Sequence, residues 1–381
     1  MAKRDKPLNV LIITGAGAST NLGANNTVLP MMKGWAADLI PRLGYAGHEL
    51  GINEDTDGPA FEAIIGRFLK FANSLDAVAA LGFMGDQTNV VGEGPRSGSN
   101  GNFASWLAAA RNNVSALNRQ LWVSLWENFG RERVDSEKAV AAYGTLHDLI
   151  RQSSDDGEPC YIAHVTTNFD TAIEVAIQES ADSRVELLDG FTAASGNARS
   201  RWAPNLLTAS RLDTDARIPV AHLHGAVGWY YDQRDTNRIE RRPSDDDYDD
   251  RLTPALLLPD DTKNPDSFTA PLAEVWEQFR ILLSGATHVF VIGHSLHDEH
   301  LVKALKEAEV PTAVMTLAEP SERVSTSKRV TGWDILDKSE VQRIESVIPG
   351  AVVIPGAFGA GYNDGDPDFD AGSFTKWLDR N

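Results

Sequence analysis

The chain is almost without cysteine: among its 381 residues only Cys160 is one. An internal disulfide needs a second cysteine, and a zinc site built from Cys-x-x-Cys units needs two such pairs. Both are therefore excluded. Cys160 also precedes its predicted strand instead of following it, which disfavours a role as a nucleophile.

Long apolar runs are also missing. No stretch approaches the roughly 20 consecutive apolar residues that a membrane span needs. The first residues, "MAKRDKPLNVLIITGAGAS", reach Gly15 and Gly17 too soon to contain the apolar region of a secretory signal. We therefore expect a cytoplasmic protein with no membrane contact.

Positive charge is scarce. The chain has 35 Lys and Arg against 54 Asp and Glu, a net charge of −19. This balance opposes non-specific attraction to nucleic acid or to anionic lipid. Small ligands or protein partners are expected instead.

Short apolar runs rich in β-branched residues predict the strands of a sheet. The first is "LNVLIIT", Leu8 to Thr14, which we place in the middle of a parallel sheet. The others end at Thr167, Leu188, His224, Gly293 and Leu317, and a seventh begins at Ala351. Helical patterns such as "DEHLVKALKEAEV" follow several of them. This alternation predicts a Rossmann-like, doubly wound α/β fold with a mostly parallel sheet.

The region from residue 30 to residue 152 breaks the alternation. Its apolar spacing is helical throughout, as in "PAFEAIIGRFLKFA" and "FASWLAAARNNVSALNRQLWVSLWENF". We predict an inserted helical subdomain over 30–152, with residues 1–29 and 153–381 forming the sheet domain. Its tryptophans, Trp35, Trp106, Trp122 and Trp126, are interpreted as core packing.

Two stretches have the composition of loops. Gly82 to Asn102 is dense in Gly, Ser and Asn, and Asp232 to Asp250 mixes charges of both signs. Ordinary solvated loops are the favoured interpretation. The alternative is that either stretch forms a lid over a site or a surface for a partner.

In an open parallel sheet, ligands bind beyond the carboxyl ends of the strands. After the first strand these positions hold Gly15, Ala16, Gly17, Ala18 and Ser19, where small residues allow a close approach of the backbone to a ligand. Thr20 replaces the third glycine of the dinucleotide fingerprint, which disfavours an ordinary dehydrogenase.

Polar residues follow two more strands. Thr167, Asn168 and Asp170 follow one, and they are either helix caps or part of a site. His222 and His224 end another, and strand alternation points them the same way, so that one could be structural and the other a base.

The segment "GHSLHDEH" contains His294, His297 and His300. Their spacing does not place three imidazoles on one helical face, so no metal site is expected. A nucleophilic serine is equally unsupported, because neither Ser19 nor Ser295 lies in a G-x-S-x-G motif.

The order of motifs GAGAS, TTNFD, HLHG and GHSLHDEH, between about Leu8 and Ala318, resembles that of the SIR2-like family, relatives of the sirtuin deacylases that consume NAD. The resemblance implies that NAD lies extended across the strand ends. Gly15, Ala16, Gly17 and Ser19 would then hold the pyrophosphate. Asn168, after Thr167, would lie beside the nicotinamide ribose, Asp170 would hold the carboxamide, and His224 would be the general base. Gly293 and Ser295 would lie on the adenosine side, with Glu319 reaching the adenine ribose.

The departures from sirtuins are informative. A single cysteine cannot build the sirtuin zinc module, and the helical insertion stands in its place. What remains resembles bacterial SIR2-like antiphage effectors, which cleave NAD to nicotinamide and ADP-ribose in abortive infection. The resemblance implies a gated NAD hydrolase without a metal, forming a homo-oligomer and activated by a protein partner such as an ATPase or an Argonaute-like protein.

Two alternatives stay open: a module that binds NAD or ADP-ribose without cleaving it, and, less favoured, a zinc-free deacylase. The sequence does not determine whether the product is linear or cyclic, what triggers activity, or how many subunits assemble. It does predict that the Asn168 amide is needed for cleavage and largely dispensable for folding.

Overall fold

The structure of the chain is a computed structural model. It describes residues 7–26, 29, 35, 37–39, 41–42, 65, 100–154, 158–180, 185–192, 200–207, 217–232, 235–242, 249, 252–257, 272–316, 338–359 and 369–379, without the side chains of 26, 100–111, 113, 232, 235–238 and 338. Glu319 and residues 82–99 of the predicted loop from Gly82 to Asn102 lie outside this part of the chain. Residues 100–102 are helical, so the loop interpretation is wrong for them.

A seven-stranded parallel sheet forms the centre of the molecule, with the order β11-β10-β9-β1-β2-β5-β3. Its strands are β1 (Leu8–Thr14), β2 (Cys160–Thr166), β3 (Glu186–Leu188), β5 (Arg217–His222), β9 (His288–Ile292), β10 (Thr312–Thr316) and β11 (Val352–Pro355). Each predicted strand is present, and β1 is the middle strand as predicted. The Rossmann-like α/β fold class is therefore confirmed.

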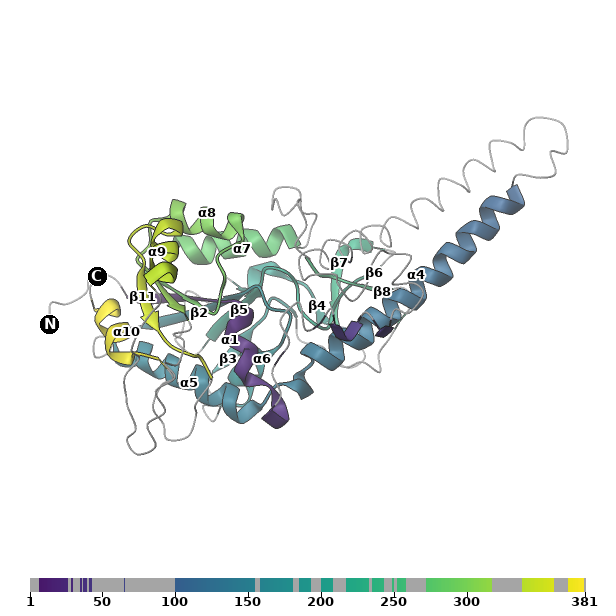
Figure 1. Cartoon of the computed structure of the whole chain (residues 1–381). Coiled ribbons are helices and arrows are strands. Elements are labelled where there is room, and N and C mark those ends of the chain that lie inside the picture. The colour runs from purple at the N-terminus through teal and green to yellow at the C-terminus, as the bar shows by residue number, and fades with distance from the viewer. Residues whose placement is uncertain are drawn as a thin grey trace.

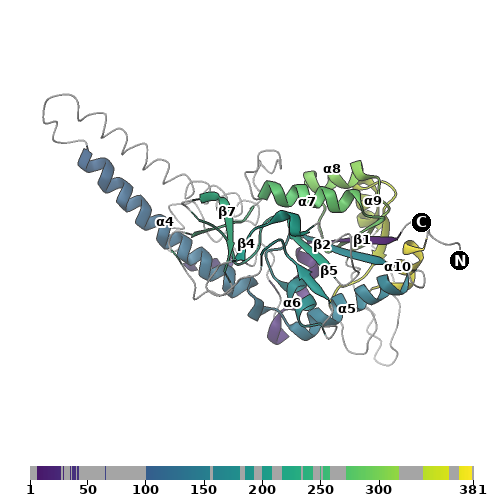
Figure 2. The same ribbon diagram turned by 180° about the vertical axis from the view of Figure 1, so that it is seen from behind.

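Helices cover both faces of this sheet (Figures 1 and 2). The helices α5 (Ser136–Gln152), α6 (Ala172–Gln178) and α10 (Ala371–Leu378) share one hydrophobic core with it. On the opposite face, α7 (Leu272–Ser284), α8 (Glu299–Ala308) and α9 (Lys338–Val347) share a second core. Strands covered on both sides read as continuous apolar runs, which explains why they could be recognised in the sequence.

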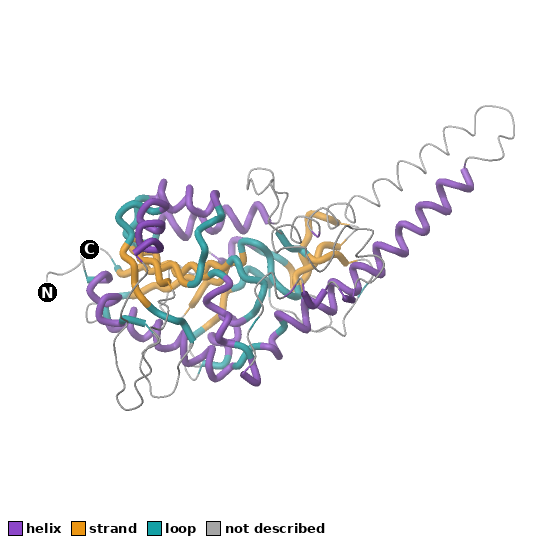
Figure 3. Tube along the Cα trace, in the orientation of Figure 1, coloured by secondary structure: helices purple, strands orange, loops and turns teal. Residues whose placement is uncertain are grey.

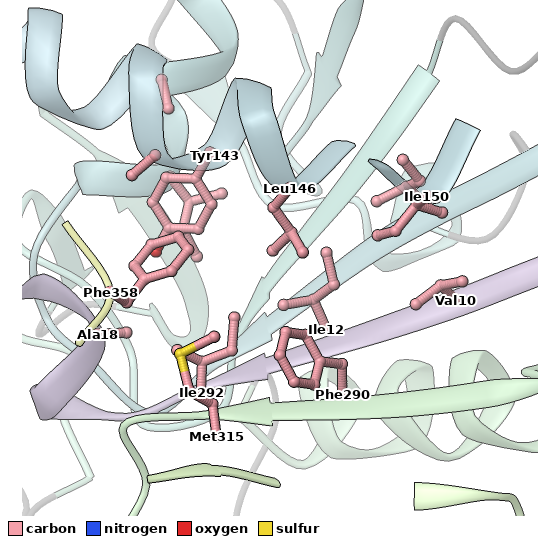
Figure 4. Packing of buried hydrophobic residues seen from close by; sticks show 14 of the residues in the cluster. Val10, Ile12, Ala18, Tyr143, Leu146, Ile150, Phe290, Ile292, Met315 and Phe358 are labelled. Atoms are coloured by element: carbon pink, nitrogen blue, oxygen red, sulfur yellow. The ribbon is translucent and has the colours of Figure 1, made fainter. Parts of the chain in front are cut away.

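The side chains of β1 alternate between these two cores. Val10 and Ile12 face α5, while Leu11 and Ile13 face the α7 side. Figure 4 shows Tyr143, Leu146 and Ile150 of α5 above Val10 and Ile12, with Phe290 of β9 beside them. These four side chains of β1 are fully buried, so the close packing around them gives the carboxyl end of the strand a fixed position.

The predicted helical region contains the long helix α4 (Asn100–Phe129) and α5, joined through the short helix η4 (Arg131–Arg133). Trp35 is fully buried and its indole N–H donates to Ser124 Oγ at 3.0 Å. Trp122 stacks on Tyr230 at 3.8 Å, and α5 packs on α6 and on the sheet. Trp35 and Trp122 therefore pack in the core, while the boundaries of a separate subdomain over 30–152 stay a prediction.

A second, antiparallel sheet lies beside α4, with the order β4-β7-β6-β8 (Figure 3). Its strands are β4 (Ser200–Arg201), β6 (Trp229–Asp232), β7 (Asp235–Arg241) and β8 (Leu252–Pro254). The interpretation of Asp232 to Asp250 as a loop is therefore wrong for β7, which pairs with both β6 and β4. The aromatic run "WYY" before a polar turn was the signal for this hairpin.

The remaining described elements are short: α1 (Ala16–Ser19), η1 (Thr20–Leu22), η2 (Ala24–Asn26) and η5 (Pro204–Leu207). The described part of the chain includes no helix with the length and apolarity needed to cross a membrane.

Candidate functional site

The carboxyl ends of β1, β2, β5 and β9 lie at one edge of the sheet. Thr14 is in register with Thr166 on one side and with Ile292 on the other, and Thr166 is in register with His222. Leu223 continues the pattern by donating its N–H to Thr166 O at 2.8 Å. The loops that follow these four strands therefore start at the same level, as the sequence predicts. Between β1 and β9 the order of the chain changes sides, which is where ligands bind in open α/β sheets.

The loops after β1 and β9 touch through their backbones. Gly15 N–H donates to Ile292 O and Gly17 N–H to Gly293 O, both at 2.9 Å. A Cβ on Gly15 would lie 2.7 Å from His294 Cα, and one on Gly17 would lie 3.0 Å from Gly293 Cα. Gly293 has φ +60°. The structure thus explains the three glycines by the contact of two backbone segments, a requirement separate from any ligand.

Asn168, Ser19 and Asp170 form a buried polar cluster. The Asn168 side-chain amide donates to Ser19 Oγ at 2.9 Å and to Gly15 O at 3.0 Å. Ser19 Oγ in turn donates to Asp170 Oδ1 at 3.1 Å. The three side chains are at most 8% exposed. A chain of donors from amide to hydroxyl to carboxylate fixes Asn168 and Asp170 relative to the loop after β1.

Asp170 also bonds to the start of α6. Its Oδ1 accepts the N–H of Ala172, the first residue of the helix, at 3.0 Å, while Thr171 holds the N-cap position. Burial raises the pKa of the Asp170 carboxyl, while the hydrogen bonds from Ala172 and Ser19 act against that rise. Asp170 therefore satisfies one N–H at the helix start, as the capping interpretation predicts, but the Asn168 side chain makes no capping bond.

The two histidines of HLHG make different contacts. β5 ends at His222, and His224 lies in the turn that follows. Strand alternation therefore does not apply to His224, and the prediction that both rings point the same way lacks its basis. His222 is fully buried, with Nδ1 3.0 Å from Asn168 O and Nε2 2.5 Å from Glu174 Oε1. Glu174 was missed in the sequence. It could have been noticed as the one acidic residue in the otherwise apolar first turns of α6.

His224 lies against a carboxylate. Its Nε2 is 3.2 Å from Asp298 Oδ2, and both residues are buried. Asp298 Oδ1 accepts the N–H groups of His300 and Leu301 and so caps α8. Asp298 lies in the segment "GHSLHDEH" that follows β9. A carboxylate held by a helix start and paired with a histidine fixes the orientation and tautomer of the ring.

The other predicted residues occupy the same edge. Thr167 N–H donates to Thr14 O at 3.1 Å, which extends the β1–β2 ladder. Ser295 is exposed, and its backbone oxygen accepts from Arg343 at 3.0 Å. His294 Nδ1 accepts the N–H of Leu296 at 2.9 Å. Among the residues that the structure covers, no group of three His, Cys, Asp or Glu side chains is placed to hold a metal ion.

Part of this chain is similar to a known protein family. The family model of the SIR2-like domain matches residues 163–323. No curated protein matches. A Sir2 enzyme structure aligns at 13% identity and a TM-score of 0.39, covering 98% of this chain and 93% of that one. A Sir2 homologue in complex with NAD aligns at 14% identity and a TM-score of 0.37, covering 98% and 88%.

The match to the SIR2-like domain covers part of the candidate site. It includes Asn168, Asp170, His224, Gly293, Ser295 and Glu319, but not the GAGAS segment after β1. Over residues 163–323, this α/β protein is similar to the SIR2-like domain.

Proposed function

We propose that the protein is an NAD glycohydrolase. It would cleave the bond between nicotinamide and ribose, so that NAD⁺ and water give nicotinamide, ADP-ribose and a proton. The pyridinium ring leaves as neutral nicotinamide because it takes the bonding electrons, and the ribose becomes oxocarbenium-like. Such a reaction needs orientation of the ring and a base for water more than it needs an acid.

The observation that carries the proposal is that two polar arrangements lie at one edge of the sheet. In the first, Asn168 and Asp170, which follow β2, are bonded to Ser19 of the segment after β1. In the second, His224, which follows β5, is paired with Asp298, which caps α8 after β9. Val227 N–H donates to Phe169 O at 2.9 Å, so the two loops are bonded to each other beyond the strands. A substrate lying across this edge would meet both arrangements.

Asn168 and Asp170 would orient the reacting end of NAD. The Asn168 amide N–H groups are used by Gly15 O and Ser19, which leaves its carbonyl oxygen as the group to face the ribose or the attacking water. Asp170 would accept from the nicotinamide carboxamide through Oδ2, since Oδ1 is used by Ser19 and Ala172. These roles follow the family resemblance of the TTNFD motif.

His224 would act as the general base. The carboxylate of Asp298 favours a proton on Nε2, so that Nδ1 is the unprotonated nitrogen and would accept a proton from the ribose hydroxyls or from water. The imidazolium formed in that step would be stabilised by the same carboxylate. The proton would then pass to solvent.

The rest of NAD would lie along the loops after β1 and β9. Gly15, Ala16, Gly17, Ser19 and Thr167 would border the pyrophosphate, and Gly293, Ser295 and Glu319 the adenosine. The contact between Gly17 and Gly293 supports this arrangement, because it brings the two loops together at the switch point of the sheet.

We further propose that this NAD hydrolase is a gated effector of bacterial antiviral defence. A hydrolase active at all times would exhaust the NAD of its own cell, so an activating partner, such as an ATPase or an Argonaute-like protein, is expected together with a homo-oligomer. The net charge of −19 suits a partner with basic patches.

One observation favours a second function, a module that binds NAD or ADP-ribose without cleavage. The Asn168 amide is engaged within the protein, at 2.9 and 3.0 Å from its acceptors, as a structural asparagine would be. Calorimetry with NAD, followed by recovery and analysis of the nucleotide, distinguishes a binding module from a hydrolase. Intact NAD after binding would favour the module, and released nicotinamide would favour the hydrolase.

A further inference from the structure

A buried charged pair lies directly behind the Asn168 loop. His222 belongs to β5 and Glu174 to α6, and their Nε2 and Oε1 atoms are 2.5 Å apart. On its other side the imidazole Nδ1 is 3.0 Å from the backbone oxygen of Asn168. The His222 side chain is 1% exposed and that of Glu174 is 14% exposed. The proposed cleavage gives no role to either residue, although His222 is the first residue of the HLHG motif.

Both nitrogens of His222 face acceptors. A neutral imidazole carries one N–H, so it could satisfy either the Asn168 oxygen or the Glu174 carboxylate, but not both. An imidazolium donates to both. The buried position opposes the charge, but the contacts with Glu174 and Asn168 O outweigh burial and raise the pKa of His222.

Other charged groups surround the pair. Asp170, in the loop between β2 and α6, adds a negative charge that also favours the imidazolium. Arg241 of β7 interacts with Glu174 and is ion-paired with Asp189. Tyr143 of α5 is fully buried near Asp170 and Glu174, and its pKa is raised by burial, so it stays neutral. The rings of His222 and Trp229 pack in a T-shaped arrangement with their centroids 5.7 Å apart.

The effect on Asp170 is reciprocal. Burial raises the Asp170 pKa and Glu174 raises it further, whereas His222 lowers it. The imidazolium therefore does two things for the same loop. It donates to the backbone of Asn168, and it supplies the positive charge that opposes protonation of Asp170.

We propose that His222 and Glu174 are positioning residues: a buried imidazolium–carboxylate pair that fixes the Asn168 backbone and keeps Asp170 ionised to receive an uncharged amide such as the nicotinamide carboxamide. The inference rests on the proposed function for its substrate. The pair itself does not touch the reacting atoms. It acts through Asn168 and Asp170, from the side of the loop formed by β5 and α6.

The first test is spectroscopic and needs no activity. In the full-length protein with ¹⁵N-labelled histidine, His222 should give the signals of an imidazolium at pH values where an ordinary histidine is neutral. Glu174→Gln should return these signals to those of a neutral ring. A neutral His222 in the wild-type protein at pH 7 would overturn the inference, whatever the protein does with NAD.

The second test is kinetic. His222→Gln keeps one donor but loses the charge, and we expect nicotinamide release about 10- to 100-fold slower, because small displacements of reacting groups cost factors of this size. Wild-type activity should fall as the pH rises through the His222 pKa, and His222→Gln should lack this fall. Glu174→Asp should recover part of the rate that Glu174→Gln loses.

His288→Gln is the matched control. His288 is also a buried histidine of the central sheet, but it starts β9 at the opposite end from the site, and its Nδ1 contacts Thr287. The activity of the His288→Gln variant per folded molecule should equal that of the wild-type protein. Equal losses in His222→Gln and His288→Gln would overturn a positioning role. Absence of turnover in the wild-type protein, beside a charged His222, would instead count against the proposed hydrolase and leave the pair established.

Discussion

Ser19 is the residue that joins the candidate site together. Its hydroxyl accepts from the Asn168 amide and donates to Asp170, and it comes from a different loop than either partner. The structure also shows that the Asn168 amide bonds to Gly15 O. Removal of that amide should therefore reduce stability as well as activity, in contrast to the sequence-based prediction that folding would hardly need it.

Ser19→Ala should lower the free energy of unfolding by about 1–3 kcal/mol, because it leaves a buried amide and a buried carboxylate each without one partner. Urea denaturation measures the change. Ser346→Ala is the control, since Ser346 is exposed and its hydroxyl donates to Arg343 O in the same helix, and its effect should stay within about 0.5 kcal/mol. Equal effects would contradict the role of Ser19.

At the scale of elements, the contact between the loops after β1 and β9 sets the geometry of the site edge. Gly293 has φ +60°, and a Cβ there would lie 2.2 Å from Ala18 N. A side chain would be strained and would also push the two loops apart.

Gly293→Ala should therefore cost about 2–4 kcal/mol of stability, the sum of a left-handed conformation and overpacking. Gly144→Ala is its counterpart, because Gly144 lies within α5 and a Cβ there meets nothing within 4 Å. That change should stabilise the protein by about 0.5–1 kcal/mol. Thermal or urea unfolding of both variants tests the difference, and a neutral Gly293→Ala would refute the packing explanation.

The sheet could be predicted from the sequence because its strands are covered on both faces. "LNVLIIT" and "HVFVI" are short, nearly continuous runs of apolar residues, and their lengths are typical of buried strands. The second sheet could not, since β7 reads "DTNRIER" and takes its structure from pairing with β6 and β4. The residues of the Asn168 cluster were predicted, but Glu174 was not, because its contact with His222 depends on how α6 packs beside β5.

At the scale of the whole molecule, buried histidines link stability to pH. His147 of α5 and His164 of β2 face each other with their Nε2 atoms 2.8 Å apart. Burial lowers the pKa of His147 and lowers that of His164 to about 3. Between pH 6.5 and these lower values the unfolded chain binds protons that the native protein does not bind. Stability should therefore fall as the pH falls below 6.5.

Replacing both residues, as His147→Gln with His164→Gln, should flatten this dependence in urea titrations between pH 7 and pH 5. His222 behaves in the opposite way, because its pKa is raised: its contribution is complete below pH 6.5 and is lost as the pH rises through its folded pKa. His222→Gln should therefore leave the slope below pH 6.5 unchanged. A slope unaffected by the double substitution would contradict the neutral, buried state of the pair.

The central claim is that the strand-end edge cleaves NAD. The most direct measurement is the release of nicotinamide and ADP-ribose from NAD by the pure full-length protein, alone and with its candidate partners, for the wild type, Asn168→Ala and His224→Ala. We predict turnover by the wild type and losses of about 10²- to 10⁴-fold in both variants, each checked for folding. NAD recovered intact under every condition, or full rates in both variants, would contradict the claim.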